Sequence, residues 1–184
     1  NSDLGIAEID HGADTVYIGA TKFSARSEAG NSLEEIKRLI GYAHQYYAKV
    51  YMALNTILTN EELPEALDII KKAYDYGIDA LIIQDFGLLE MELPPVPLIA
   101  STQMHNDSVE KVKFLEEVGF KRVILARELS LEEIADIRKN TKVELECFVH
   151  GALCVCYSGQ CYMSKATRGR SGNRGVCAQP CRHS

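Results

Sequence analysis

The stretch Ala80-Leu81-Ile82-Ile83-Gln84 decides the fold class, because it is apolar at every position before Gln84. A strand of this kind has no polar side to turn toward water, so both of its faces are expected to be covered. That arrangement is typical of a parallel sheet with helices packed against it. The strand is preceded by Tyr76-Gly77-Ile78-Asp79, in which Gly77 is a typical helix end. A helix, a glycine and a short apolar strand therefore form the building unit.

The same unit recurs along the chain at intervals of roughly 20 to 35 residues, a spacing suited to parallel βαβ connections. Six apolar segments are predicted strands: Thr15–Gly19, Val50–Asn55, Ala80–Gln84, Pro97–Thr102, Arg122–Ala126 and Val143–Val149. The amphipathic segments around them are predicted helices: Ser2–Ile9, Ser32–Gln45, Asn60–Tyr76, Asp107–Val118 and Ser130–Lys139. Ser32 and Ser130 are each followed three residues later by glutamate, which is a capping box, and Asp107 is expected to be an N-cap.

We expect an α/β fold, a parallel (βα) TIM-like barrel that is incomplete in this fragment and has a cysteine-rich C-terminal segment. Six strands are two short of a closed barrel, and we expect one strand before Asn1 and one after Ser184. An open doubly wound sheet is the alternative, but no glycine-rich phosphate loop follows an early strand. Within one domain, residues 1–146 are assigned to the barrel units, and residues 147–184 to the end of the last visible strand and the cysteine-rich segment.

Composition favours a cytoplasmic protein. The chain has 184 residues, of which 46% are hydrophobic and 25% charged, as in ordinary globular domains. No apolar run approaches the roughly 20 residues of a membrane span, and no signal peptide opens the chain. All six cysteines lie in residues 147–184, whereas a secreted disulfide scaffold would distribute them along a small chain. Their clustering favours a metal or iron–sulfur site, and the oligomeric state stays open.

Charge divides the chain in the same place. All 26 acidic residues lie in 1–146, where 15 basic residues leave a net charge of −11. The last 38 residues have no acidic residue and five basic ones: Lys165, Arg168, Arg170, Arg174 and Arg182. This asymmetry is typical of a segment that meets an anionic partner. The alternative is that these side chains offset nearby thiolates or the acidic body.

Polar residues follow the predicted strands at their carboxyl ends, which is where barrel enzymes place their active sites. A ring of such residues predicts a lined pocket. We assign Gln103, Arg127, Glu128 and His150 to catalysis. We assign Arg26, Asn55 and Asp85 to substrate binding, together with the basic residues Lys165, Arg168, Arg170 and Arg174.

The cysteine-rich segment contains His150-Gly-Ala-Leu-Cys154, Ser158-Gly-Gln-Cys161 and Asn173-Arg-Gly-Val-Cys177-Ala-Gln-Pro-Cys181-Arg182. These motifs closely resemble those of the collagenase-like peptidase family of unknown catalytic type, number thirty-two in that series. Shorter matches are Gly12-Ala-Asp-Thr-Val-Tyr-Ile-Gly19, Ser101-Thr-Gln-Met104 and Ala126-Arg-Glu128, so the resemblance spans essentially the whole chain.

The resemblance implies two kinds of activity. Some members are named proteases. Others resemble oxygen-independent hydroxylases of ribosomal RNA, transfer RNA or a quinone precursor, with a [4Fe–4S] cluster and, in several cases, prephenate as the source of the hydroxyl group. The spacing here is closest to the RNA-modifying branch. By the family pattern, Cys154, Cys161 and Cys177 are cluster ligands, with the fourth from Cys181 or from beyond Ser184.

The residues agree with this pattern and leave alternatives open. Thiolates suit iron–sulfur clusters or zinc, although no Cys-x2-Cys knuckle is present. Arg26 and Arg127 suit a small dicarboxylate such as prephenate, because guanidinium groups bind carboxylates in a bidentate fork. Cys147 is expected to pack inside a strand. We expect an iron–sulfur enzyme that hydroxylates an RNA base; a peptidase using a cysteine or a metal, and a non-catalytic RNA-binding accessory subunit, are the alternatives.

Overall fold

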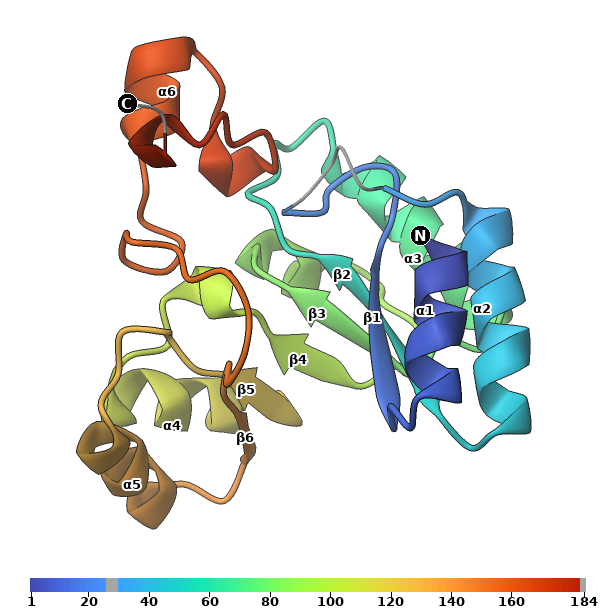
Figure 1. Cartoon of the computed structure of the whole chain (residues 1–184), viewed down its shortest axis with the longest axis horizontal. Helices are drawn as coiled ribbons and strands as arrows, with labels where there is room; N and C mark the ends of the chain where they lie inside the picture. The colour runs from blue at the N-terminus through green and yellow to red at the C-terminus, as the bar shows by residue number, and fades with distance from the viewer. Residues whose placement is uncertain (26–29, 183–184) are drawn as a thin grey trace.

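A computed structural model describes residues 1–25 and 30–182 of the chain and has one parallel sheet as its framework (Figure 1). Its six strands follow one another in sequence order, and each neighbouring pair is parallel. They are β1 Thr15–Gly19, β2 Lys49–Leu54, β3 Ala80–Ile83, β4 Leu98–Ala100, β5 Arg122–Ile124 and β6 Glu144–Glu146. The predicted parallel (βα) architecture is therefore confirmed as an open half-barrel.

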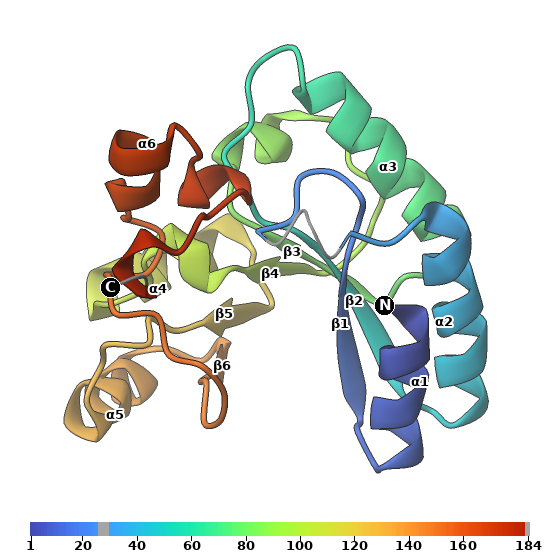
Figure 2. The ribbon, with the colours of Figure 1, turned by 45° about the horizontal axis from the view of Figure 1, so that its top comes forward.

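Helices cover the outer, convex side of this sheet (Figure 2). They are α1 Ser2–Asp10, α2 Leu33–Gln45, α3 Leu63–Asp75, α4 Val109–Val118 and α5 Leu131–Asn140. Alternate residues of β2 divide between two cores. Val50, Met52 and Leu54 belong to the large core shared with the helices, whereas Tyr51 packs in a smaller cluster with inward residues of β3, β4 and β5. This alternation explains why the strand sequences are apolar on both faces.

Helix starts follow the capping signals with two differences. Ser32 and Ser130 form the predicted capping boxes with Glu35 and Glu133. The prediction of Asp107 as a cap was wrong, because Ser108 accepts the hydrogen bond from the backbone of Lys111 and caps α4. Helix α3 begins at Leu63, after a turn at residues 60–62, and not at residue 60.

Strand β6 is shorter than the predicted strand Val143–Val149, since it ends at Glu146. Cys147 consequently lies outside the sheet and is exposed, so the prediction that it packs inside a strand was wrong. Pairing with β5 ends at Ile124↔Glu146, which leaves the following residues without a ladder partner in the described sheet. From this point the chain turns toward the carboxyl ends of the strands.

Side chains of the two edge strands meet at the inner face of the half-barrel. The Tyr17 hydroxyl of β1 donates a hydrogen bond to Glu146 of β6. Arg122 of β5 donates to Glu146 at 3.3 Å and to Glu144 at 2.8 Å, and its guanidinium lies 5.4 Å from the centre of the Tyr51 ring. Burial and the neighbouring Glu146 carboxylate raise the pKa of Tyr17, so the phenol stays protonated and remains a donor.

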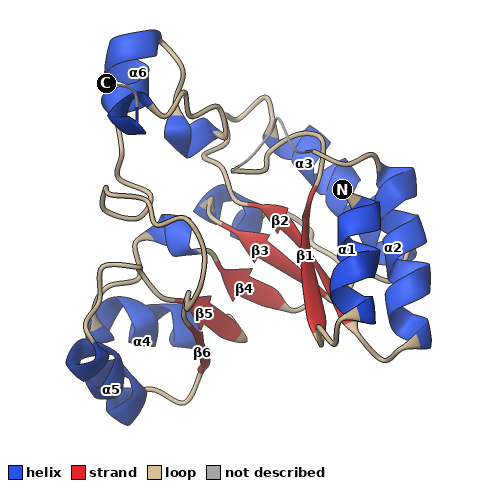
Figure 3. Cartoon of the chain, in the orientation of Figure 1, coloured by secondary structure: helices blue, strands red, loops and turns tan. Residues whose placement is uncertain are grey.

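Residues 147–182 form little regular structure (Figure 3). Their elements are α6 Met163–Arg168 and two short 3-10 helices, η4 Gly172–Arg174 and η5 Pro180–Arg182. Two more 3-10 helices, η2 Phe86–Glu90 and η3 Thr102–Met104, follow β3 and β4. Within the part of the chain that is described, no helix is long and apolar enough to cross a membrane.

Candidate active site lined by cysteines

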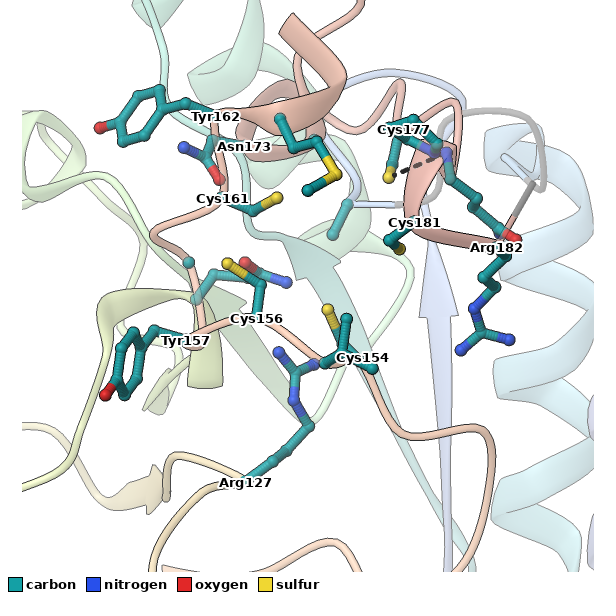
Figure 4. Close-up of a pocket in the computed structure, with 18 of the residues that line it drawn as sticks. Arg127, Cys154, Cys156, Tyr157, Cys161, Tyr162, Asn173, Cys177, Cys181 and Arg182 are labelled. Atoms are coloured by element: carbon teal, nitrogen blue, oxygen red, sulfur yellow. Dashed lines mark hydrogen bonds between the residues drawn. The ribbon is translucent and has the colours of Figure 1, made fainter. Parts of the chain in front are cut away.

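A cavity of about 560 Å³ lies between the cysteine-rich segment and the loops that follow the strands. Five of the six cysteines line it: Cys154, Cys156, Cys161, Cys177 and Cys181. Figure 4 shows their sulfur atoms arranged around one hollow, with Arg127 beside Cys154 and Cys156. The four cysteines that the sequence proposes as ligands are thus brought together from positions up to 27 residues apart. Cys147 is not part of this lining.

Ser158 anchors the first half of the segment to the barrel. Its backbone N–H donates to one carboxylate oxygen of Glu128 at 3.0 Å, and its hydroxyl donates to the other at 2.9 Å. The backbone N–H of Arg127 donates to the same hydroxyl at 3.3 Å. Partial burial opposes ionisation of Glu128, but the hydrogen bonds from Ser158 outweigh it and lower the pKa of the carboxyl group. Glu128 therefore acts as a charged clamp on the segment.

Gly159 brings the backbone even closer to the barrel. A Cβ atom at this position would lie 1.9 Å from the carbonyl oxygen of Gln103, and the backbone has φ +71°. Gly175 makes a similar approach, where a Cβ atom would lie 2.1 Å from the carbonyl oxygen of Ser24 at φ +78°. Only glycine tolerates such contacts and such a backbone conformation. Both halves of the segment are therefore fitted against loops that follow barrel strands.

Arg174 fixes the second half of the segment. Its guanidinium donates to both oxygens of Glu62, at 2.6 and 3.0 Å, and to the carbonyl oxygen of Ile57 at 2.9 Å. The hydrogen bond from Arg174 is the first of the causes that lower the pKa of Glu62. The predicted RNA-binding role of Arg174 thus competes with an evident structural role. Lys165 and Arg168 lie on α6 and are exposed, while Arg170 donates from Nε to the carbonyl oxygen of Val176 at 3.2 Å.

A second cavity, of about 710 Å³, extends from the mouth of the half-barrel along β1 to α1. Asn55, Gln103, Arg127 and His150 line it, and Gln103 and Arg127 also line the cysteine cavity. Three of the four residues assigned to catalysis therefore line the same cavity. Glu128 is not in this lining, since its carboxylate is engaged with Ser158.

The residues predicted to bind substrate separate in the structure. Asn55 accepts from the backbone N–H of Ala25 at 2.9 Å and donates to Ser101 at 3.1 Å, so it orders the barrel mouth. Asp85 accepts from the backbone of Leu58 and of Gly87, each at 2.8 Å, and is not in the lining of either cavity. Its predicted contact with substrate is therefore not supported by this geometry. Arg26 lies outside the described residues.

His105 is a site neighbour that the sequence left unassigned. Its Nε2 lies 3.0 Å from Asp107 and its Nδ1 lies 3.3 Å from Glu128, and its ring meets the Tyr157 ring edge-on at 5.8 Å. The residue adopts a left-handed conformation with φ 60°, which is uncommon for a residue other than glycine. No sequence signal connects His105 with residues 157 and 158, because the contact arises only when the segment folds back on the barrel.

Comparison with known proteins identifies the family. Residues 3–184 match the sequence profile of peptidase family U32. The chain belongs to peptidase family U32. One curated relative, the 23S rRNA 5-hydroxycytidine C2501 synthase of Escherichia coli strain K12, is 54% identical over 182 residues, which are 98% of this chain and 28% of that protein. The tRNA hydroxylation protein P1 of Bacillus subtilis strain 168 is 36% identical over 178 residues, 95% of this chain and 42% of that protein.

A solved structure supports the U32 fold independently. The U32 peptidase Mk0906 superposes with a TM-score of 0.64 at 20% identity, over 77% of this chain and 63% of that chain. At this level of identity the likeness shows the fold alone. The chain spans less than half the length of each of these two curated relatives, so the complete relatives contain much that is not present in this sequence.

Proposed function

We propose that this chain is the cluster-binding part of a U32 enzyme that hydroxylates an RNA base. The observation that carries the proposal is the cavity lined by Cys154, Cys161, Cys177 and Cys181, adjoining a barrel mouth that contains Arg127. The names of the two relatives point in the same direction, since both are described by hydroxylation of RNA. We propose Cys154, Cys161 and Cys177 as three of the cluster ligands and Cys181 as the fourth.

The donor set fits a [4Fe–4S] cluster. Four thiolates are the usual ligands of such a cluster, and the cavity volume is in the range of ordinary ligand pockets. Within residues 1–25 and 30–182, no three histidine, cysteine, aspartate or glutamate side chains are grouped closely enough to hold a single metal ion. Cluster ligands are spaced more widely, because each thiolate binds a different iron. A bound cluster would supply one-electron redox chemistry beside the barrel mouth.

Arg127 is proposed to bind a small carboxylate co-substrate at the barrel mouth, of which prephenate is the family example. Its Nε is buried and has no hydrogen-bond partner among the described residues, so the guanidinium has a donor available for a ligand. A guanidinium binds a carboxylate through two parallel hydrogen bonds, which would orient the co-substrate. Gln103 and His150 line the same cavity and are proposed to contact the bound molecule or to move a proton there.

Lys165 and Arg168 are proposed to contact RNA phosphates. Both lie exposed on α6, directly after the cavity residues Tyr162 and Met163. The segment from Cys147 onward contains no carboxylate side chain to repel a polyanion. A non-catalytic RNA-binding accessory role would use the same surface, and differs by requiring no cluster in this chain.

The peptidase alternative draws on the name of the U32 peptidase Mk0906, but the geometry gives it less support. A cysteine nucleophile needs a base within hydrogen-bond reach. His150 lines the barrel mouth, whereas Cys154 and Cys161 line the other cavity. Ser158 is buried and its hydroxyl donates a hydrogen bond to Glu128, so it is not poised as a nucleophile.

The proposal is tested by deleting the gene in the source organism and analysing ribosomal and transfer RNA by mass spectrometry. We expect one hydroxylated nucleoside to disappear. The full-length protein and its Cys147→Ala variant should restore it, because Cys147 lies outside the cavity, whereas Cys161→Ala should not. An unchanged RNA profile, together with peptide cleavage by metal-free protein that is lost in Cys154→Ala, would establish the peptidase instead.

A further inference from the structure

Two donors in the wall of the cysteine cavity are buried and have no partner among residues 1–25 and 30–182. They are Nε of Arg127 and Nδ2 of Asn173. Buried polar groups are normally hydrogen-bonded, and an unpaired one costs about 1–3 kcal/mol. The Asn173 residue is only 5% exposed, so its amide cannot turn to bulk water. A donor in this position is suited to an acceptor atom of a molecule that enters the cavity.

The backbone around Asn173 is fixed on both sides. The carbonyl oxygen of Asn173 accepts from the backbone N–H of Ile57 at 3.1 Å. The next residue, Arg174, is held by Glu62, and Gly175 packs against the carbonyl oxygen of Ser24. The backbone position of Asn173 is therefore fixed before any ligand binds, which limits where its side-chain amide can lie.

Two tyrosines of the same cavity are largely exposed. Tyr157 is 67% exposed and Tyr162 is 64% exposed, and both contribute to the lining. Their rings extend to the same side of the cysteine sulfur atoms (Figure 4). Tyr157 is steadied by the edge of His105, which leaves much of its ring accessible. Accessible aromatic faces bind unpaired bases by stacking, at about 1–3 kcal/mol for each base.

We propose that the tyrosine side of the cysteine cavity is a nucleobase-binding site. An unpaired RNA base stacks on Tyr157 or Tyr162, and the Nδ2 of Asn173 donates a hydrogen bond to a carbonyl oxygen or ring nitrogen on the edge of the base. Lys165 and Arg168 on the adjoining α6 meet the flanking phosphates. The inference rests on the proposed RNA substrate and adds which residues hold the base and which of them reads its edge. Chemistry on a base requires such an extruded nucleotide.

The stacking part is tested with full-length, cluster-loaded protein and a fluorescent single-stranded RNA oligonucleotide, compared with the same backbone carrying abasic sites. Tyr157→Ala and Tyr162→Ala should weaken binding of the base-bearing RNA by roughly 5- to 100-fold. Tyr157→Phe should bind normally, because it keeps the ring. Tyr47→Ala is the matched control, since Tyr47 is 95% exposed but lies after α2, outside the cavity lining. The abasic RNA should bind weakly to wild type and be insensitive to the tyrosine variants.

The edge-reading part is tested with Asn173→Asp, which replaces the donor by an acceptor of the same shape, and with Asn173→Ala. Both should weaken binding of base-bearing RNA at least about tenfold, at unchanged iron content and unchanged reduction potential. Normal RNA affinity with a shifted reduction potential would show that Asn173 serves the metal site, and would overturn the inference. Lower thermal stability of the tyrosine variants with unchanged RNA affinity would also overturn it, because the rings would then be covered by the protein's own chain. Wild type that binds no RNA would instead refute the proposed function itself.

Discussion

Residues 1–146 and residues 147–182 are stabilised in different ways. The first region buries aliphatic side chains between sheet and helices, such as Leu39, Leu54 and Ile83, each of which is fully buried. In the second region every buried residue is polar or a glycine: Ser158, Gly159, Ser164, Asn173 and Gly175. Most of its large apolar side chains are exposed, with Val149 at 95% and Val155 at 81%. The second region is thus held by hydrogen bonds and close backbone approaches, with no apolar core of its own among the described residues.

This difference indicates that the two regions have different roles in the structure. An apolar core gives a rigid support, and the hydrogen-bonded segment holds the thiols on it. A segment without a core gains order from whatever binds between its halves, because a ligand that binds only the folded state stabilises it. Metal ligation by four cysteines would be such a contribution. Substitutions in the first region are therefore expected to lower the stability of the whole fold, whereas those in the second region should loosen the cysteine-rich segment.

The largest loss of stability is expected for a substitution in residues 1–146, called the body below. Leu81→Ala should lower the free energy of unfolding by about 2–5 kcal/mol, because Leu81 is fully buried and its removal leaves a cavity. Urea denaturation followed by circular dichroism measures this change. Leu131→Ala is the control, since Leu131 is 81% exposed and should cost less than about 0.5 kcal/mol. Equal losses in the two variants would show that the apolar core does not dominate the stability of the body.

Two glycines with nearly the same backbone conformation sharpen the comparison for the segment. Gly159 has φ +71° and no room for a Cβ atom, whereas Gly169 has φ +69° and nothing within 4 Å of one. Gly169→Ala should cost about 1–2 kcal/mol from backbone strain alone. Gly159→Ala should cost more, because the Gln103 carbonyl must also move. The segment should then become sensitive to limited proteolysis while the helix content of the body is unchanged; equal protease resistance of both variants would contradict the close fit.

Sequence reasoning succeeded where local signals determine structure. The capping boxes at Ser32 and Ser130 and the apolar run at Leu81 specify their elements without help from distant residues. It failed where the decisive contact is long-range. No local signal predicts that Glu128 binds Ser158, which lies 30 residues away, and the assignment of Glu128 to catalysis stays a prediction. Cys147 was placed inside the predicted strand Val143–Val149, but pairing with β5 ends at Glu146.

The anchor between body and segment should depend on pH. The folded pKa of Glu128 is lowered, so its contribution is complete above its ordinary value of 4.5 and is lost as pH falls through the lower folded value. Glu128→Gln should therefore weaken the anchor at neutral pH by about 1–2 kcal/mol and reduce this acid sensitivity. Because the pKa of Glu62 is lowered as well, by Arg174, part of the sensitivity should remain. The rate of proteolysis of the segment, followed between pH 3 and 7, measures both the weaker anchor and the acid sensitivity. Identical profiles for the variant and the wild type would show that Glu128 does not hold the segment.

The smallest effects separate two arginines of the segment. Arg174→Ala should lower stability by about 1 kcal/mol, because an exposed ion pair and one hydrogen bond to a carbonyl are lost. Arg168→Ala should leave stability unchanged within about 0.5 kcal/mol. It should instead reduce the slope of log affinity for RNA against log salt concentration by about 1. Salt titrations with both variants measure this slope. An unchanged slope for Arg168→Ala would show that Arg168 does not contact RNA phosphates.

The central claim is that the cysteine cavity binds an iron–sulfur cluster, and the most direct test is to count iron and acid-labile sulfide in full-length protein purified without oxygen. We predict about four iron and four sulfide ions per chain and a brown protein solution. Cys154→Ala, Cys161→Ala, Cys177→Ala and Cys181→Ala should each lose most of the iron, whereas Cys147→Ala should keep it, because Cys147 lies outside the cavity. Unchanged iron content in all four cavity variants, or equal loss in Cys147→Ala, would contradict the account.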